Sequence, residues 1–261
     1  NGVFFENIEN FNKKKYFKNK NKKYDLIIGR HIVEHFFDPK KFIFNLKLLL
    51  NPKNGFVYFE IPDSLKSMSK FDYNMLWEQH KMYFTKNTLQ NLMTKCNFKT
   101  IFNNIYKYKY ENCLLYLGNL QNKKLNPFIF ENDLKRSLEY FSKIKKVKKN
   151  LIIYFKKLSK KGNLLIYGAG HQTIMFIYLF NLKKFIKFIV DDNQLYIKKY
   201  LPGTNFKIEK KNFKKQFKYC FISANFENEK KIIKNNKFFL KNKVIQSLSF
   251  FDNIKGSGRH V

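Results

Sequence analysis

The sequence YDLIIGRHIVEHFFDP, residues 24–39, determines the class of fold. Its first six residues form a short, mostly apolar run after a stretch rich in Lys and Asn, which predicts a strand buried in a parallel sheet. Pro39 suits the first position of a helix, which we expect to end near residues 51–52. The apolar run at residues 55–61 predicts the next strand. Strand, helix and strand in this order form a βαβ unit, so the chain is predicted to be α/β.

Further secondary structure is expected on both sides of a polar segment that contains Pro127. A helix capped by Thr85 or Asn87 is predicted to run to Lys95 and to precede a closing hairpin. A second α/β unit begins at the apolar residues 163–167. We therefore predict a first α/β domain over residues 1–118, a linker and long helix over 119–162, a small Rossmann-like domain over 163–250, and a disordered tail over 251–261.

The composition favours a folded protein with a lysine-rich surface. Hydrophobic residues make up 44% of the chain, which is too much apolar material for a disordered protein. The formal net charge of +33 is typical of nucleic-acid binders. Here, however, the basic residues are nearly all Lys, and they are spread along the chain among Asn, Ile and Phe. We therefore expect a solvated Lys surface and no nucleic-acid partner, although such a field would attract an anionic nucleotide substrate.

Cysteine usage and hydropathy favour a cytoplasmic protein. Cys96, Cys113 and Cys220 lie far apart in the sequence and include no C-x-x-C pair, so neither a zinc site nor a disulfide framework is predicted, and no metal is expected. No apolar run of about 18 residues is present, and the first residues lack the charged-then-apolar order of a signal peptide. We expect no membrane partner, and the sequence leaves open whether the protein is a monomer or a homo-oligomer.

The opening motif resembles the fourth strand and following loop of class I methyltransferases, in which a strand leads to Glu-His just before a helix. Residues 51–62, NPKNGFVYFEIP, resemble the fifth strand of that family. Ligands in open α/β sheets bind at the carboxyl ends of strands, where His31, Glu34 and His35 would lie. The resemblance implies S-adenosylmethionine as methyl donor, with His31 and Glu34 as donor-binding residues. The alternative is that these residues only cap or satisfy a loop, as Asp38 would do for the helix at Pro39.

Residues 76–85, LWEQHKMYFT, resemble the catalytic stretch of the sugar C-methyltransferases. In that family a His removes the proton beside a keto group, and the enolate attacks the methyl group of the donor. The resemblance implies His80 as the base, which suits an imidazole at neutral pH, and His35 as a donor to the enolate oxygen. Trp77, Glu78 and Gln79 complete the catalytic prediction. The family carries Tyr and Glu where this chain has Trp77 and Gln79, and a buried aromatic with a satisfied His remains the structural alternative.

A third set of motifs resembles the C-terminal domain of the same C-methyltransferases. The set comprises LLIYGAGHQ at residues 164–172, FIVDDN at 188–193, YLPGT at 200–204 and ISAN at 222–225, in the order found in the family. In the family this domain helps to hold the nucleotide sugar, and glycines let a phosphate approach a helix N-terminus. The substrate-binding residues predicted on this basis are Gly168, Gly170, His171, Asp191 and Asp192. Simple tight packing of the glycines is the alternative.

The predicted fold is therefore a partial class I methyltransferase sheet followed by a second, small Rossmann-like domain. The predicted function is S-adenosylmethionine-dependent C-methylation of a keto-deoxy-sugar nucleotide. The family's glycine-rich first strand-turn is not found in the sequence, so we expect a fragment with an incomplete donor site. A non-catalytic nucleotide-sugar-binding module and a decayed methyltransferase are the alternatives. An NAD-dependent oxidoreductase is disfavoured, because Thr173 replaces the third glycine of the G-x-G-x-x-G fingerprint.

Overall fold

The computed structural model describes residues 23–73, 76–108, 111–127, 131–211, 215–224, 226–237, 239–241, 243–247 and 259–260. These residues form two compact units. The first contains the described residues up to Met68 together with Glu78–Ser137, and the second contains Ser69–Trp77 and the described residues from Leu138 onward. Each unit has its own sheet with flanking helices, so the prediction of an α/β protein is confirmed.

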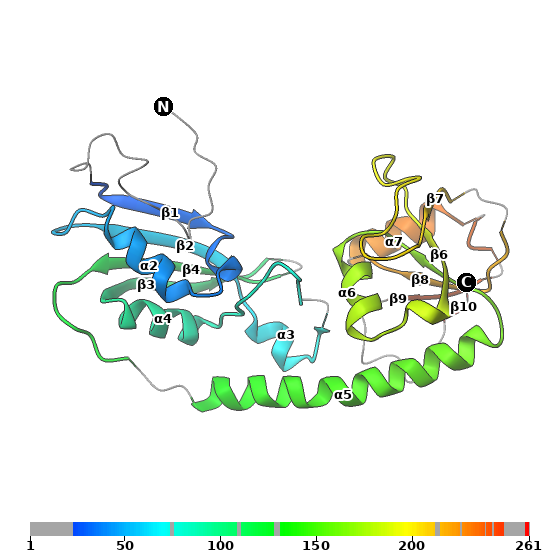
Figure 1. Ribbon diagram of the computed structural model, residues 1–261, viewed down its shortest axis with the longest axis horizontal. Helices are drawn as coiled ribbons and strands as arrows, with labels where there is room; N and C mark the ends of the chain where they lie inside the picture. Colours follow the sequence, from blue (N-terminus) through cyan, green and yellow to red (C-terminus); the bar gives the residue numbers. More distant parts are fainter. Residues whose placement is uncertain are drawn as a thin grey trace. The chain divides into compact units, whose positions relative to one another are not determined.

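The first unit is a four-stranded sheet in the order β1-β2-β4-β3 (Figure 1). Its elements are β1 (Leu26–Arg30), η2 (Val33–His35), α2 (Pro39–Lys47), β2 (Phe56–Pro62), α3 (Leu65–Ser69), α4 (Lys86–Lys95), β3 (Phe98–Tyr106) and β4 (Cys113–Leu120). β1 and β2 are parallel, whereas β4 is antiparallel to both of its neighbours. The predicted βαβ unit and closing hairpin are both confirmed.

Local sequence signals fix the helices of this unit. The Asp38 side chain accepts a hydrogen bond from the backbone N–H of Lys41 at 2.9 Å, and Pro39 occupies the first turn of α2. Thr85 caps α4 through a reciprocal capping box with Thr88. The apolar faces of α2 and α4 then meet one face of the sheet in a single core, which includes Phe42, Ile43, Leu46, Val57, Phe59, Ile61, Leu89 and Met93.

The second unit is a six-stranded sheet in the order β10-β9-β8-β5-β6-β7. Its elements are β5 (Leu164–Tyr167), α6 (His171–Leu179), η4 (Lys183–Phe185), β6 (Ile186–Val190), β7 (Ile208–Glu209), β8 (Tyr219–Ile222), α7 (Phe226–Asn235), β9 (Val244–Ser247) and β10 (Arg259–His260). All neighbouring strands are parallel except the pair β9–β10. In the predicted tail, residues 251–258 and 261 lie outside the described residues, and Arg259–His260 form β10.

Strand order in the second sheet indicates the edge of the sheet at which a ligand is expected. From the central strand β5 the chain runs to β6 and β7 on one side, and then returns to β8 and β9 on the other. The order therefore reverses between β5 and β8, and ligands of open α/β sheets bind at the carboxyl ends of the strands at such a point. Gly168 and Ser223 follow these two strands directly.

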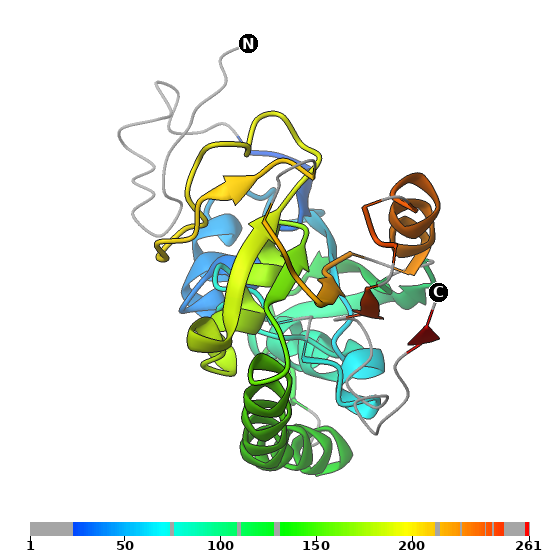
Figure 2. The same cartoon turned by 90° about the vertical axis from the view of Figure 1, so that its right-hand side faces the viewer.

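The helix α5 (Glu131–Ser159) is continuous in both views (Figure 1 and Figure 2). From Leu138 onward it belongs to the second unit, where Phe155 stacks on Phe221 with ring centroids 4.6 Å apart. Two reciprocal hydrogen bonds of 2.9 Å attach the segment around residue 73 to this helix, from the Tyr73 hydroxyl to the Tyr140 carbonyl and from the Tyr140 hydroxyl to the Asp72 carbonyl. The segment before Trp77 is thereby fixed to the second unit.

None of the helices in the described part of the chain is both long enough and apolar enough to cross a membrane.

Candidate functional site

Three side chains of the first unit converge just beyond the carboxyl end of β1. Glu34 and His35 belong to the short helix η2, and His80 lies in the loop that leads to α4. One nitrogen or oxygen atom from each of the three lies within 4.8 Å of the others. Glu34 is buried and both histidines are half-buried, so the group opens to solvent on the histidine side. We call Glu34, His35 and His80 the histidine–glutamate triad.

Three backbone contacts attach the His80 loop to η2. The backbone N–H groups of Lys81 and Met82 both donate to the Glu34 carbonyl, at 2.8 and 3.0 Å. The Gln79 carbonyl lies 3.1 Å from Nδ1 of His35. These contacts involve residues on both sides of His80 in the sequence. The ring centroids of His80 and His35 are 4.9 Å apart, with an interplanar angle of 78°. The position of His80 is therefore set by backbone hydrogen bonds.

The contact with Gln79 also indicates which ring nitrogen of His35 carries the proton when the ring is neutral. A carbonyl oxygen only accepts hydrogen bonds, so Nδ1 of His35 carries the proton in this arrangement. The neutral ring then presents a lone pair at Nε2, and the ring becomes a double donor only as an imidazolium ion. His35 can thus donate a hydrogen bond through Nε2 only when it is positively charged.

Glu34 supplies a negative charge beside these rings. Its side chain is 2% exposed, and neither carboxylate oxygen accepts a hydrogen bond from any residue that the structure describes. Burial raises the pKa of Glu34, against a smaller opposite effect of the charges on His35 and His31. A buried carboxylate without hydrogen bonds is costly, and such groups are found where function requires them.

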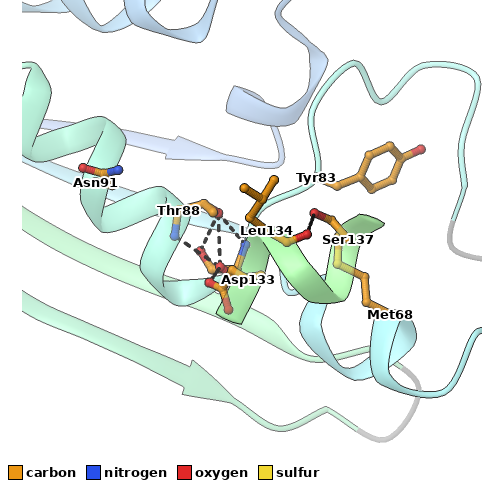
Figure 3. Close-up of a pocket in the computed structure, with 8 residues that line it drawn as sticks. Met68, Tyr83, Thr88, Asn91, Asp133, Leu134 and Ser137 are labelled. Carbon is orange, nitrogen blue, oxygen red and sulfur yellow. Dashed lines mark hydrogen bonds between the residues drawn. The ribbon is translucent and has the colours of Figure 1, made fainter. Parts of the chain in front are cut away.

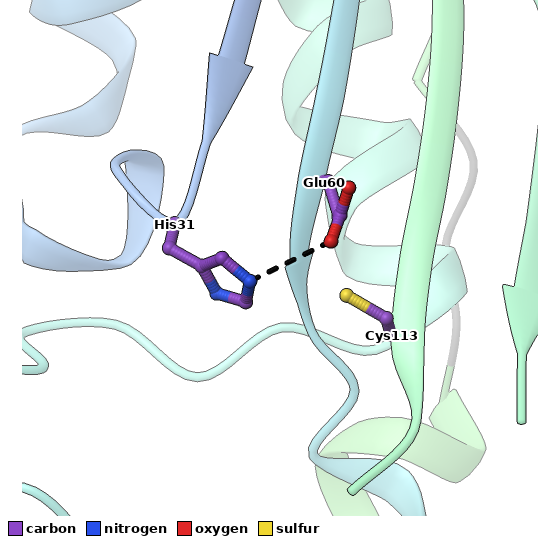
Figure 4. A group of neighbouring side chains, drawn as sticks. All are labelled: His31, Glu60 and Cys113. Carbon is purple, nitrogen blue, oxygen red and sulfur yellow. Dashed lines mark ion pairs between the residues drawn. The ribbon is translucent and has the colours of Figure 1, made fainter. Parts of the chain in front are cut away.

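A second cluster adjoins the triad and was not predicted from the sequence. His31, Glu60 and Cys113 each offer one ligand-type atom within 4.8 Å of the others (Figure 4). His31 lies between two carboxylates, with Nδ1 3.6 Å from Glu34 and Nε2 3.6 Å from Glu60. Its φ of +49° is uncommon for a residue other than glycine. His31 therefore links the two clusters.

Arg30 holds the carboxylate of this second cluster. Its guanidinium donates to both Glu60 oxygens, at 2.8 and 3.0 Å, and this contact lowers the pKa of Glu60. Burial raises the pKa of the Cys113 thiol to about 12, so the thiol stays protonated at neutral pH. The register of β1 and β2 places Arg30 directly opposite Glu60. The sequence signal for this pair is a basic residue and an acidic residue near the carboxyl ends of two neighbouring parallel strands.

A separate cavity of about 230 Å³ lies at the N-terminus of α4 (Figure 3). Asp133, which is 5% exposed, accepts a hydrogen bond of 2.6 Å from the hydroxyl of Thr85. Thr85 is also the cap of α4, so this contact joins the start of α5 to the start of α4. The carboxylate of this cavity is accordingly engaged in holding the two helix ends together.

The predicted catalytic stretch is divided between the two units after Trp77. In the second unit Trp77 stacks on His171, with ring centroids 3.9 Å apart and an interplanar angle of 22°. The Leu76 carbonyl lies 3.2 Å from Nε2 of His171. Glu78 and Gln79 are exposed residues of the first unit. Within the second unit, the structure thus brings Trp77 together with His171, a predicted substrate-binding residue.

The two predicted glycines of the second unit, Gly168 and Gly170, differ in backbone conformation and in the space around them. Gly168 has a φ of +111°, and a Cβ there would lie 2.5 Å from the carbonyl oxygen of Ser223. Gly170 is the N-cap of α6 with an ordinary negative φ, and a Cβ there would meet no atom within 4 Å. Packing alone therefore requires Gly168, whereas the space beside Gly170 at a helix N-terminus is open to a ligand.

Asp191 is engaged by the backbone. One of its carboxylate oxygens accepts from the N–H of Ala169 at 2.6 Å and the other from the N–H of Asn193 at 2.7 Å. Thr173 is fully buried and donates its hydroxyl to the carbonyl of Gly168. In a dinucleotide site the Asp191 carboxylate would have to bind a ribose hydroxyl of the cofactor. Because both of its oxygens already accept hydrogen bonds from the backbone, the structure disfavours NAD as a ligand. Asp192 is exposed and lies 3.6 Å from the ammonium of Lys211.

Two buried hydroxyls without a hydrogen-bond partner among the described residues lie at the carboxyl edge of the second sheet. They are the Tyr167 hydroxyl and the Ser223 Oγ. Burial first and the carboxylate of Asp192 second raise the pKa of Tyr167. Tyr167 ends β5 and Ser223 directly follows β8, the two strands that flank the point where the strand order reverses, so this edge offers polar groups to a ligand.

Comparison with known families matched two regions of the chain. Residues 2–102 match the family model of a methyltransferase domain, and residues 131–245 match that of a C-methyltransferase C-terminal domain. The first match includes β1 and η2, and the second includes the strands and helices from α5 to α7. No curated protein matches the chain.

Proposed function

Because the chain belongs to the C-methyltransferase family, we propose that it acts in the methylation of a carbon beside the keto group of a deoxy-sugar nucleotide, with S-adenosylmethionine as donor. The observation that carries this proposal is the pair of histidines His35 and His80, with ring centroids 4.9 Å apart. The difficult step is removal of a proton from carbon, and this step needs a base and an acid close together.

The spacing of the two rings suits this step. In a ketone the carbon that loses its proton and the carbonyl oxygen are separated by roughly 2.4 Å, as standard bond lengths give. Two imidazoles at van der Waals distance from each other reach these two atoms without rearrangement of the loop. His80 takes the proton from carbon, and His35 donates a hydrogen bond to the oxygen on which negative charge develops.

Glu34 places a carboxylate beside His35. Because Nδ1 of His35 donates to Gln79, a second donor at Nε2 requires the imidazolium form. A carboxylate oxygen of Glu34 lies within 4.8 Å of a ring nitrogen of His35, so Glu34 is positioned to balance a positive charge that this ring takes up during proton transfer. Glu34 is thus a positioning and charge-balancing residue in this proposal.

His31 and Glu34, the predicted donor contacts, lie beside the proposed proton-transfer residues. Glu34 is 2% exposed, and both nitrogens of His31 face carboxylates at 3.6 Å. Their role toward the donor stays a prediction. The proton-transfer step needs only His80, His35 and Glu34.

For the second unit we propose binding of the nucleotide part of the substrate at the carboxyl edge of its sheet. Gly170 leaves open space at the N-terminus of α6, where backbone N–H groups attract a phosphate. The exposed face of Trp77, stacked on His171, lies in the same unit. The Lys-rich surface supports the proposal, because a positive field raises the association rate of an anionic substrate.

Calorimetry with several ligands tests the substrate class. We expect a keto-deoxy-sugar nucleotide to bind at one molecule per chain, and NAD to bind far more weakly because the Asp191 carboxylate is engaged by backbone N–H groups. Binding of NAD that is tighter than binding of the sugar nucleotide would contradict the proposal. Tight sugar-nucleotide binding without any proton exchange on the sugar would identify a binding module instead.

A further inference from the structure

We propose that Glu34, His35 and His80 form a binding site for one divalent transition-metal cation of the Zn²⁺ or Co²⁺ type. Two imidazoles and one carboxylate are a common set of protein ligands for such cations, which prefer nitrogen and oxygen donors together. The inference rests on the geometry of the triad and does not depend on the proposed methyl transfer. A cation bound there would occupy the lone pairs of His35 and His80, so it would block the proposed proton transfer for as long as it is bound.

The spacing within the triad allows the three side chains to converge on one cation. Bonds from Zn²⁺ to His nitrogen or carboxylate oxygen measure about 2.0–2.2 Å, so ligand atoms at the corners of a tetrahedron around one cation are roughly 3.3–3.6 Å apart. The three ligand atoms of the triad lie within 4.8 Å of one another. Side-chain rotations that shorten these separations by up to about 1.5 Å bring all three into coordination.

The buried carboxylate is the second observation that points to a cation. Glu34 is 2% exposed, and neither of its oxygens accepts a hydrogen bond from the described residues, although His31 lies at 3.6 Å from one of them. A cation beside this carboxylate would replace the missing hydrogen bonds and would offset the cost of burying the charge.

His35 has the outer contact that is typical of a metal-bound histidine. Metal ligands of this kind usually donate their other ring N–H to a carbonyl or carboxylate, which fixes the tautomer and the ring orientation. The contact of Nδ1 with the Gln79 carbonyl at 3.1 Å is of this kind, and it leaves the lone pair on Nε2. The same backbone segment also fixes the position of His80, so two of the three ligands are held by one short loop.

The adjoining cluster of His31, Glu60 and Cys113 is the less suitable site. Both oxygens of Glu60 accept hydrogen bonds from Arg30, and the thiol of Cys113 donates to the Ile61 carbonyl at 3.3 Å. A cation there would have to displace a guanidinium and remove a proton from a thiol whose pKa is raised to about 12. In the triad no comparable contact has to be broken at Glu34.

Cobalt titration of the chelator-treated protein tests the proposal. Co²⁺ bound to such ligands gives visible absorption bands, and we expect these bands to saturate at one Co²⁺ per chain. The titration is done near 0.15 M salt, where the Debye length of about 8 Å screens the general positive charge of the surface. Zn²⁺ is expected to abolish the bands by competition, whereas excess Mg²⁺ leaves them unchanged because Mg²⁺ prefers oxygen ligands.

Matched variants locate the site. Glu34→Gln, His35→Ala and His80→Ala are each expected to weaken Co²⁺ binding by about 100-fold or more, whereas Glu78→Gln and His171→Ala are expected to leave it unchanged. Glu34→Gln removes a buried charge at nearly unchanged volume, so we expect this variant to stay folded, and thermal unfolding checks that its loss of Co²⁺ binding is not caused by unfolding. Absence of saturable bands in the unaltered protein would overturn the proposal, and so would bands that persist in Glu34→Gln and His80→Ala or that disappear in His171→Ala.

Discussion

The His80→Asn variant is expected to exchange deuterium into the carbon beside the keto group about 10²- to 10⁴-fold more slowly than the unaltered protein, which is the usual contribution of a general base. Asparagine keeps a similar size and polarity but has no basic nitrogen at neutral pH. The backbone contacts of Gln79, Lys81 and Met82 that hold this loop do not involve the His80 side chain, so the loop is expected to keep its position. Proton NMR of the sugar nucleotide in D₂O measures the rate.

Lys81→Asn is a suitable control for this comparison. It introduces the same side chain one residue further along and retains the backbone N–H that donates to Glu34. The Lys81 ammonium is exposed and contacts the Glu78 carbonyl and the ring of Phe37, so its loss is expected to change the exchange rate by less than about 3-fold. Undiminished exchange in His80→Asn would exclude His80 as the base.

Gly168→Ala is expected to lower the free energy of unfolding of the second unit by about 3 kcal/mol or more. The φ of +111° is unfavourable for any L-residue with a side chain. The added Cβ would also lie 2.5 Å from the backbone oxygen of Ser223, which is part of the sheet edge and cannot move freely. Urea unfolding measured by the fluorescence of Trp77, the one tryptophan in the sequence, reports on this unit.

Gly170→Ala separates packing from ligand binding. Its Cβ would enter open space and its φ is ordinary, so we expect its unfolding midpoint to lie close to that of the unaltered protein. A methyl group at this position would nevertheless hinder a phosphate at the N-terminus of α6. A stability loss in Gly170→Ala equal to that in Gly168→Ala would contradict the distinction between the two glycines.

The sequence was sufficient to predict the elements that depend on local signals. The strand before Gly29, the Asp38-Pro39 helix start and the Thr85 cap are all in the structure, because capping acts over a few residues. The prediction that this strand is buried is wrong for the described sheet, because β1 lies at its edge with Leu26 and Ile28 exposed. The resemblance to C-methyltransferases is likewise confirmed by the two family matches. The sugar-nucleotide substrate, the cytoplasmic location and the roles of the site residues remain predictions.

Long-range contacts were not predictable from the sequence in the same way. Arg30, Glu60 and Cys113 come from three different strands, so their proximity depends on register and strand order. The division of the stretch Trp77-Glu78 between two units also has no local signal, since it follows from the attachment of residues 72 and 73 to α5. The engagement of Asp191 by the backbone of Ala169 likewise requires the folded sheet edge.

Donor-free deuterium exchange tests whether the triad of the first unit removes a proton from a carbon beside a keto group. The unaltered protein is mixed with a keto-deoxy-sugar nucleotide in D₂O without S-adenosylmethionine, and the sugar protons are followed by NMR. The proposed roles of His80 and His35 predict protein-dependent loss of the signal from the carbon beside the keto group, while signals elsewhere on the sugar persist. Exchange no faster than in buffer alone, with the nucleotide shown to be bound, would contradict these roles.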